Sequence, residues 1–251
     1  MKTKISWVIY CLMSLVLLQP LSAAERFVAN EGSGFVWIRQ GKAYPILIDP
    51  QEDKGVVRAV VNLQTDAGKV TGVTPEIINS ASGRRMLIVG SIENSSWIKQ
   101  LLQSGKINAA DLQGKREKYI LQTVKNPIGG VEEAVVIAGS DKRGTIYGIY
   151  ELARQMGVSP WYFWADVPVE KHDVISIKEG IYTDGEPAVK YRGIFLNDEW
   201  PSLGGWASTT FGGFNSKFYE TVFELVLRLK GNFMWPAMWN SAFYDDDPMN
   251  G

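Results

Sequence analysis

Cysteine and histidine are almost absent from this 251-residue sequence. The one cysteine, Cys11, lies in an apolar N-terminal segment, and the one histidine, His172, lies in a polar turn. Without that segment the chain has no cysteine, which excludes disulfides, thiolate metal sites and a cysteine nucleophile. We expect His172 to be a solvated loop residue, so neither a histidine-rich metal site nor a serine–histidine–aspartate triad is predicted.

The sequence also lacks an excess of charge of either sign. It has 26 Lys and Arg against 27 Asp and Glu, and its formal net charge is −1. No long basic run occurs, so neither nucleic acid nor an anionic membrane is an expected partner of the mature protein. The hydrophobic content of 45% is ordinary for a globular protein.

The first 24 residues have the pattern of a secretory signal peptide. Lys2 and Lys4 precede an apolar run over residues 5–18, and a Ser-Ala-Ala sequence then supplies small residues for cleavage. The mature chain is predicted to begin at Glu25, in a secreted or periplasmic protein. An uncleaved membrane anchor is the alternative interpretation.

Residues 25–185 alternate between strand and helix patterns, which predicts an N-terminal α/β layer domain. The segments 87–91 and 136–140 resemble each other, because each is an apolar run that ends in Gly-Ser before a helix. The expected strands are 34–40, 42–48, 86–89, 117–124 and 134–138, with a hairpin at Gly41, and the expected helices are 55–63, 95–103 and 141–156.

A nucleotide cofactor is not predicted, although one glycine-rich turn precedes a helix. Residues 139–145 lack the lysine that follows the second glycine of a phosphate-binding loop, and no G-x-G-x-x-G sequence is present. We therefore expect Ser140 or Asp141 to cap the helix, by accepting from its free backbone N–H groups. No cofactor and no metal are expected.

Residues 186–251 have the pattern of the first strand–helix–strand portion of a (β/α)8 barrel. A strand over 191–196, expected to be buried, precedes a Gly- and Ser-rich loop over 200–214. A helix capped by Asn215 or Ser216 follows, and a second strand covers 232–235. The apolar face of this helix is expected to need a barrel partner, whereas Glu224 and Arg228 are expected to pair on the opposite face of the helix. The strand, helix and next strand together take about forty residues, which is typical of such a barrel. Only one and a half of the eight units precede Gly251, so the barrel is predicted to be incomplete.

Polar and aromatic side chains follow both of these strands. Asn197, Asp198 and Glu199 follow the first, and Trp235 and Trp239 follow the second. Barrel enzymes carry their chemistry at the carboxyl ends of strands. Carboxylate and amide oxygens can accept from sugar hydroxyls, and tryptophan can pack on the C–H face of a sugar ring. These five residues are predicted to bind substrate; loop capping and filling of the barrel mouth is the alternative. The acidic run 245–247 is expected to be a solvated loop and not a calcium site.

Several long ungapped segments resemble glycoside hydrolase family 115. They are residues 139–148, 159–168, 191–200, 211–215, 218–220, 223–232, 235–239 and 242–248. The resemblance implies an inverting xylan α-glucuronidase that releases glucuronic acid or its 4-O-methyl ether. It also implies a catalytic barrel after the N-terminal domain, further C-terminal domains and a homodimer.

Within this resemblance Asp198 is the best match for an active-site acid that contacts the sugar. The catalytic acid and base are unknown and are expected beyond Gly251, because an inverting glycosidase needs two separated carboxylates. The sequence as it stands is therefore expected to be an inactive N-terminal fragment. A non-catalytic carbohydrate-binding or interaction module is the alternative function.

Overall fold

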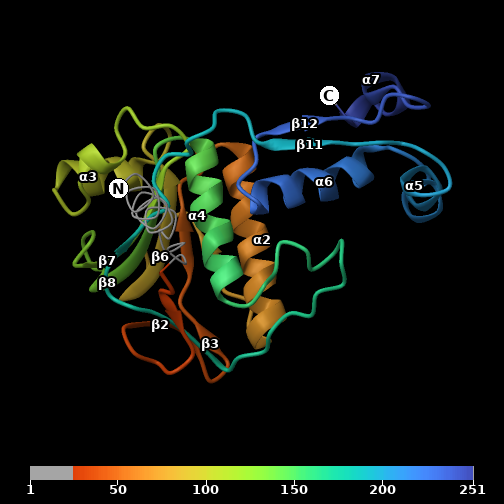
Figure 1. Cartoon of the computed structure of the whole chain (residues 1–251). Helices are drawn as coiled ribbons and strands as arrows, with labels where there is room; N and C mark the ends of the chain where they lie inside the picture. The colour runs from red at the N-terminus through yellow and green to blue at the C-terminus, as the bar shows by residue number, and fades with distance from the viewer. Residues whose placement is uncertain (1–24, 251) are drawn as a thin grey trace, which may run out of the picture.

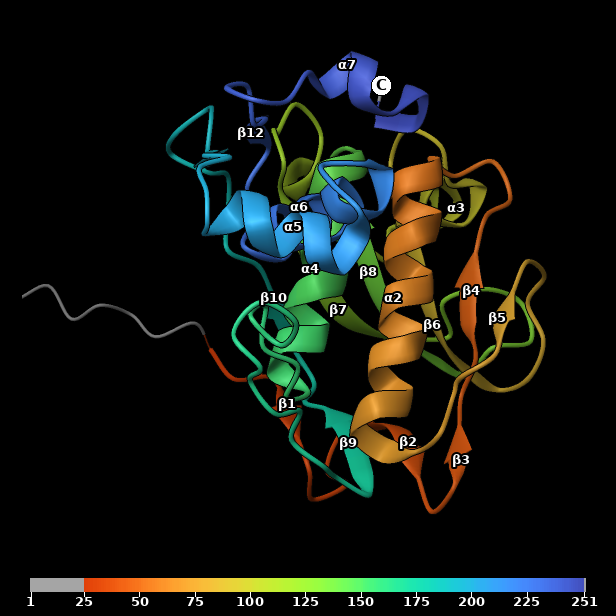
Figure 2. The same cartoon turned by 90° about the vertical axis from the view of Figure 1, so that its right-hand side faces the viewer.

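The computed structural model describes residues 25–250 (Figures 1 and 2). The predicted signal peptide, with Cys11, and Gly251 lie outside the described residues. Among residues 25–250, no helix has both the length and the apolar character needed to cross a membrane.

A six-stranded mixed sheet forms the centre of the N-terminal part, in the order β10-β7-β8-β6-β4-β5. The strands β5, β4, β6 and β8 are parallel, whereas β7 and β10 run antiparallel to their neighbours. The predicted α/β class is confirmed. The bounds are Ile46–Ile48 for β4, Ile77–Ile78 for β5, Arg85–Ser91 for β6, Tyr119–Lys125 for β7, Glu133–Gly139 for β8 and Ile181–Tyr182 for β10.

Helices cover both faces of this sheet (Figure 1). The helices α2 (Lys54–Thr71) and α4 (Lys142–Gln155) pack side by side on one face, and α3 (Ser96–Gln103) lies on the other. Successive residues of β6 alternate between the two cores: Leu87 packs on the α2–α4 side and Ile88 on the α3 side. Because both faces are covered, the strand is a continuous apolar run.

The expected cap of α4 is present, and Asp141 supplies it. Its Oδ1 accepts from the N–H of Gly144 at 2.7 Å, and its Oδ2 accepts from the N–H of Glu117 at 2.7 Å. A Cβ at Gly139 would lie 2.2 Å from the backbone nitrogen of Thr145. The glycine is therefore required by the close approach of α4 to β8, which supports a structural origin for this Gly-Ser sequence.

A four-stranded antiparallel sheet, in the order β1-β9-β2-β3, lies at the other end of α2 and α4. The predicted hairpin at Gly41 is confirmed, but the predicted strand 42–48 is wrong. It divides at Pro45, which lacks an N–H and cannot continue the ladder, so β4 enters the six-stranded sheet. The bounds are Val28–Ala29 for β1, Phe35–Arg39 for β2, Lys42–Ala43 for β3 and Val174–Ile177 for β9.

The C-terminal part contains a two-stranded parallel sheet with helices between its strands (Figure 1). The register pairs Ile194 of β11 with Met234 of β12. Asn215 caps α6 by accepting from the N–H of Phe218 at 3.2 Å, as predicted. The bounds are Gly193–Phe195 for β11, Leu203–Phe211 for α5, Ser216–Arg228 for α6, Phe233–Trp235 for β12 and Phe243–Asp246 for α7, and two 3-10 turns cover Ala109–Asp111 and Pro248–Asn250.

Two expectations for this part are wrong. The strand β11 is not buried, since Ile194 and Phe195 are 37% and 49% exposed, and β12 is its one strand neighbour among the described residues. The predicted loop 200–214 contains α5. Its Trp206 packs against Trp164, and its Phe211 packs against Phe163. These tertiary contacts outweigh the low helix propensity of the glycines in α5.

The helix α6 docks on α2 and α4 through buried charge as well as apolar contact. The predicted pair of Glu224 and Arg228 is confirmed at 2.8 Å, but its face is not solvated. Arg228 is 5% exposed and also donates to Asp66 of α2 at 2.7 Å. The apolar face of α6 was expected to need a barrel partner, but Phe218 and Val222 are already buried within the described residues, whereas Leu229 is 45% exposed.

A second buried carboxylate, Glu151 of α4, makes stability depend on acid pH. It accepts from Gln155 at 2.9 Å and Lys230 at 2.9 Å, and it pairs with Arg154. Burial alone would raise the pKa of Glu151, but these donors outweigh burial and lower the pKa to about 2.

We therefore expect the stabilisation from Glu151 to be present above its unfolded-state pKa and to be lost as pH falls from there towards 2. The free energy of unfolding should fall by on the order of 2–3 kcal/mol more in the unaltered chain than in Glu151→Gln between pH 5 and pH 2. Urea unfolding of both proteins across this range measures the difference. Parallel pH profiles would show that Glu151 is not the responsible group.

Candidate functional site

The loops that follow β11 and β12 meet at one edge of the two-stranded sheet. Because the strands are parallel and in register, their carboxyl ends lie together. Three of the five predicted site residues are joined there by hydrogen bonds: Asn197, Asp198 and Trp239.

Asp198 anchors the loop after β12. Its side chain is 1% exposed. Its Oδ1 accepts from the N–H of Trp239 at 3.2 Å, and its Oδ2 accepts from the N–H of Asn240 at 2.7 Å and from Ser241 Oγ at 3.0 Å. Burial would raise the pKa of Asp198, but these bonds hold it below its usual range, so the carboxylate stays charged.

The indole ring of Trp239 is hydrogen-bonded through its Nε1 and is largely exposed to solvent. Its Nε1 donates to Asn197 Oδ1 at 3.1 Å, while 66% of its surface is accessible. An indole fixed in this way offers a flat apolar platform, and the Asn197 Nδ2 group beside it remains a donor.

The other two predicted residues are not part of this hydrogen-bonded set. Trp235 is half exposed, donates to Met238 Sδ at 3.2 Å and packs edge-on against Phe195. Glu199 is exposed. Its backbone carbonyl accepts from the hydroxyl of Ser202.

Sequence reasoning missed three residues around Asp198. Asn240 and Ser241 complete its set of donors, and nothing in the sequence pattern distinguishes them from other loop residues. Tyr219 of α6 is buried beneath the loops, and burial, with the carboxylates of Asp246 and Asp198, raises its pKa to about 12. No role was assigned to Tyr219 from the sequence.

The acidic run 245–247 was expected to be a loop, but Asp245 and Asp246 lie in α7, and two of the three carboxylates accept from backbone N–H groups. Asp246 accepts from the N–H of Ala242 at 2.9 Å, and Asp247 accepts from those of Ser216 and Met249 at 2.9 Å each. Residues 25–250 contain no group of three or more His, Cys, Asp or Glu residues placed to hold a metal ion.

His172 is less solvated than predicted. Its Nε2 lies 3.2 Å from Asn30 Nδ2 and 3.3 Å from a Glu170 carboxylate oxygen, so it bridges two loops and is half-buried. These contacts indicate a structural position.

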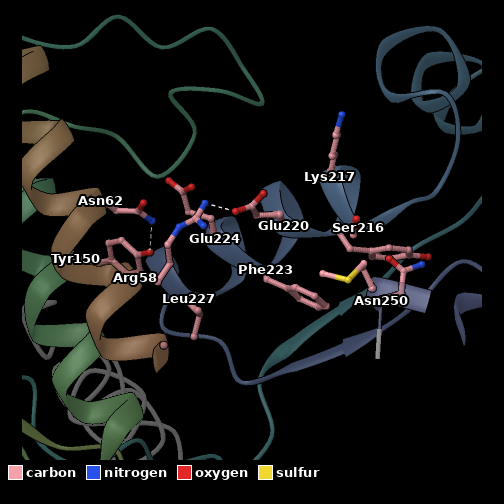
Figure 3. A pocket seen from close by; sticks show the side chains of 13 residues that line it. Arg58, Asn62, Tyr150, Ser216, Lys217, Glu220, Phe223, Glu224, Leu227 and Asn250 are labelled. Carbon is pink, nitrogen blue, oxygen red and sulfur yellow. Dashed lines mark hydrogen bonds and ion pairs between the residues drawn. The ribbon is translucent and has the colours of Figure 1, made fainter. Parts of the chain in front are cut away.

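A cleft of about 420 Å³ separates α2 from α6 (Figure 3). Figure 3 shows Arg58 reaching across it to Glu220, and Asn62 donates to the Tyr150 hydroxyl at 2.8 Å. Arg58 and Glu220 pair across the contact between α2 and α6, and Asn62 and Tyr150 join α2 to α4, so the cleft is a crevice in a packing interface and a weaker candidate than the loops around Asp198.

Comparison with known proteins links the chain to glycosyl hydrolases. The sequence profile of Glycosyl hydrolase family 115 matches residues 184–251, and that of Glycosyl hydrolase family 67 N-terminus matches residues 37–152. No curated protein sequence matches significantly.

One similar solved structure is BtGH115A, a family GH115 4-O-methyl-alpha-glucuronidase with specificity for decorated arabinogalactans. It has a TM-score of 0.75 and 32% identity over 86% of this chain, which spans 28% of the BtGH115A chain.

Two further solved structures are more distant from this chain. A mutant Streptomyces plicatus beta-hexosaminidase has a TM-score of 0.48 at 14% identity, over 81% of this chain and 31% of its own. CpGH84D has a TM-score of 0.45 at 10% identity, over 86% of this chain and 37% of the CpGH84D chain.

The matched profile contains the whole Asn197, Asp198 and Trp239 set, and the likeness to BtGH115A extends over most of the N-terminal part as well. The chain belongs to glycoside hydrolase family 115.

Proposed function

We propose that this chain supplies part of the active site of a glycoside hydrolase that releases glucuronic acid, or its 4-O-methyl ether, from a branched polysaccharide. The observation that carries the proposal is the buried Asp198 carboxylate, which joins the two strand-end loops and holds Trp239 with its face exposed. A rigid indole beside an amide suits the apolar face and hydroxyls of a sugar ring.

The proposed role of Asp198 is positioning, and neither acid nor base is assigned to it. Three protein donors already occupy its two oxygens, and its lowered pKa leaves it no proton to give. Inversion needs an acid and a base carboxylate about 6.5–9.5 Å apart. We infer that these two groups lie outside the present sequence, as the sequence analysis predicts.

The proposed frame for this site is the start of a (β/α)8 barrel over residues 186–251, after an α/β domain over 25–185. The parallel pairing of β11 and β12, with α5 and α6 between them, is what such a start requires. The exposed faces of Ile194 and Phe195 are consistent with further barrel layers. The 251-residue chain alone is therefore expected to release no uronic acid.

Two polysaccharide backbones are candidates. The family resemblance in the sequence favours glucuronoxylan. The specificity of BtGH115A for decorated arabinogalactans favours a polymer of that kind. Secretion and a homodimeric assembly remain proposals that the sequence analysis alone supports.

The test is to express the complete gene in its own host and to measure uronic acid release from glucuronoxylan and from a decorated arabinogalactan. The anomeric form of the first product, followed by NMR, checks inversion. Release from either polymer supports the proposal and selects the backbone. Binding of both polymers without release from either would favour the alternative, a non-catalytic carbohydrate-binding module.

A further inference from the structure

The β2–β3 hairpin carries a second feature that suits a ligand. A groove of about 610 Å³ runs along it, and its lining includes Arg39, Gln40, Lys42, Tyr44 and Arg85. The hairpin lies at the end of the molecule opposite to β11 and β12 (Figure 1). The groove is therefore remote from the candidate active site.

Two of its cations face each other across the hairpin. Arg39 and Lys42 are direct partners in the antiparallel register. Like charges in this arrangement destabilise a strand pair. Within residues 25–250 neither side chain forms an ion pair, and the one bond from Arg39 reaches the carbonyl of Gly32 at 3.5 Å. Their repulsion is thus not offset by the protein itself.

The neighbouring carboxylates are already paired with other cations. Glu133 pairs with Arg85 at 3.0 Å, and Glu132 pairs with Arg84 at the same end of β6 and β8. Two further exposed carboxylates, Glu31 and Asp173, adjoin Gly32 and Val174, which neighbour Arg39, but among the described residues neither forms an ion pair with Arg39 or Lys42.

An aromatic ring completes the groove. Tyr44 is 37% exposed, and the Arg85 guanidinium lies 6.0 Å from its ring centroid. The Tyr44 backbone is fixed to Trp37 by two hydrogen bonds, at 2.9 and 3.0 Å. A fixed and half-exposed ring beside unpaired cations offers both an apolar platform and anion recognition.

We propose that this groove is a non-catalytic binding site for an anionic saccharide. A sugar carboxylate lies between Arg39 and Lys42 and relieves their repulsion, and the C–H face of the sugar packs on Tyr44. The charge and shape of the groove favour an anionic saccharide independently of the proposed function. The choice of glucuronic acid as that saccharide rests on the proposed function.

A competing role for these cations is protection of a sheet edge. The strand β3 is the edge strand of its sheet, and charged side chains on edge strands discourage pairing between molecules. That role predicts aggregation when the charges are removed, with saccharide binding unchanged in the remaining monomer.

The test measures binding of the full chain to glucuronoxylan and to the same polymer after reduction of its carboxyl groups. The double variant Arg39→Gln/Lys42→Gln is expected to bind glucuronoxylan roughly tenfold more weakly and to lose the preference for the unreduced polymer. The matched control is Lys54→Gln/Lys99→Gln, which removes the same charge from two exposed lysines of α2 and α3 and should bind as the unaltered chain does.

Tyr44→Ala separates a saccharide site from a general anion site. It should weaken binding of glucuronoxylan and leave binding of poly-glutamate unchanged. Equal binding of glucuronoxylan by the double variant and the unaltered chain would overturn the proposal. Equal loss of poly-glutamate and glucuronoxylan binding in Tyr44→Ala would overturn the saccharide assignment.

The assay of uronic acid release is independent of this measurement. Loss of glucuronoxylan retention in the double variant supports the groove even if the complete protein releases no uronic acid. Release of uronic acid with unaltered retention in the double variant supports the proposed function and overturns the groove.

Discussion

Replacement of Asp198 by alanine is expected to reduce uronic acid release by the complete protein roughly a hundredfold or more, because small displacements of positioned groups cost about that much. The variant loses the acceptor for Trp239, Asn240 and Ser241, so the loop after β12 is no longer held to the end of β11. The kinetics of release from the preferred polymer measure the effect. Asp245→Ala is the control, since Asp245 is an exposed carboxylate in the next turn.

A second readout separates positioning from direct participation in the reaction. If Asp198 acts through the loop, acrylamide quenching of tryptophan fluorescence should change in Asp198→Ala, and Asp198→Asn, which keeps one acceptor oxygen, should recover part of the activity. An inactive Asp198→Ala variant with unchanged quenching would instead place Asp198 in contact with the reacting sugar. Full activity in Asp198→Ala would contradict both roles.

The sequence predicted the local elements well where one signal dominated. The caps at Asp141 and Asn215 lie where the polar residue precedes an apolar helical pattern, and each side chain accepts from a free N–H of its helix. The buried strands β6 and β8 were recognisable from their apolar runs alone.

The errors occur where a distant contact decides the structure. Periodicity placed Arg228 on the face of its helix opposite the apolar one, and the sequence cannot show that Asp66, more than 150 residues away, meets Arg228 in the interior. The strand over 191–196 was expected to be buried because it is apolar, yet burial depends on a layer that the described residues do not supply.

The candidate site shows the same division. Strand-end position and residue type were enough to select Asn197, Asp198 and Trp239, which the structure brings into contact. They could not show that Asp198 would be buried and bonded by three donors, because two of the donors are backbone N–H groups, which carry no sequence signal. The role of any of these residues in binding a sugar stays a prediction.

Replacement of Arg228 by alanine is expected to destabilise the protein by about 3–5 kcal/mol, since it removes the hydrogen-bonded partner of a buried carboxylate and leaves, among the described residues, only Lys69, 3.6 Å away. Asp66 is 1% exposed, and burial raises its pKa even with Arg228 beside it. Arg228 also lies 4.5 Å from the ring centroid of Tyr150, so the variant loses a cation–π contact as well. Urea unfolding measures the change in free energy.

The chain contains a matched control for this prediction. Arg58 also joins α2 to α6, through Glu220, but its side chain is 58% exposed and that of Glu220 is 51% exposed. An exposed pair contributes about 0–1 kcal/mol, so Arg58→Ala should have little effect on unfolding. The double variant Asp66→Asn/Arg228→Met removes both buried charges together and should be closer to the unaltered protein than Arg228→Ala is. Equal losses in Arg58→Ala and Arg228→Ala would mean that burial of the charge does not set its contribution. A large loss confined to Arg228→Ala would mean that one buried ion pair fixes α6, and through it the strand β12 that carries the Trp239 loop.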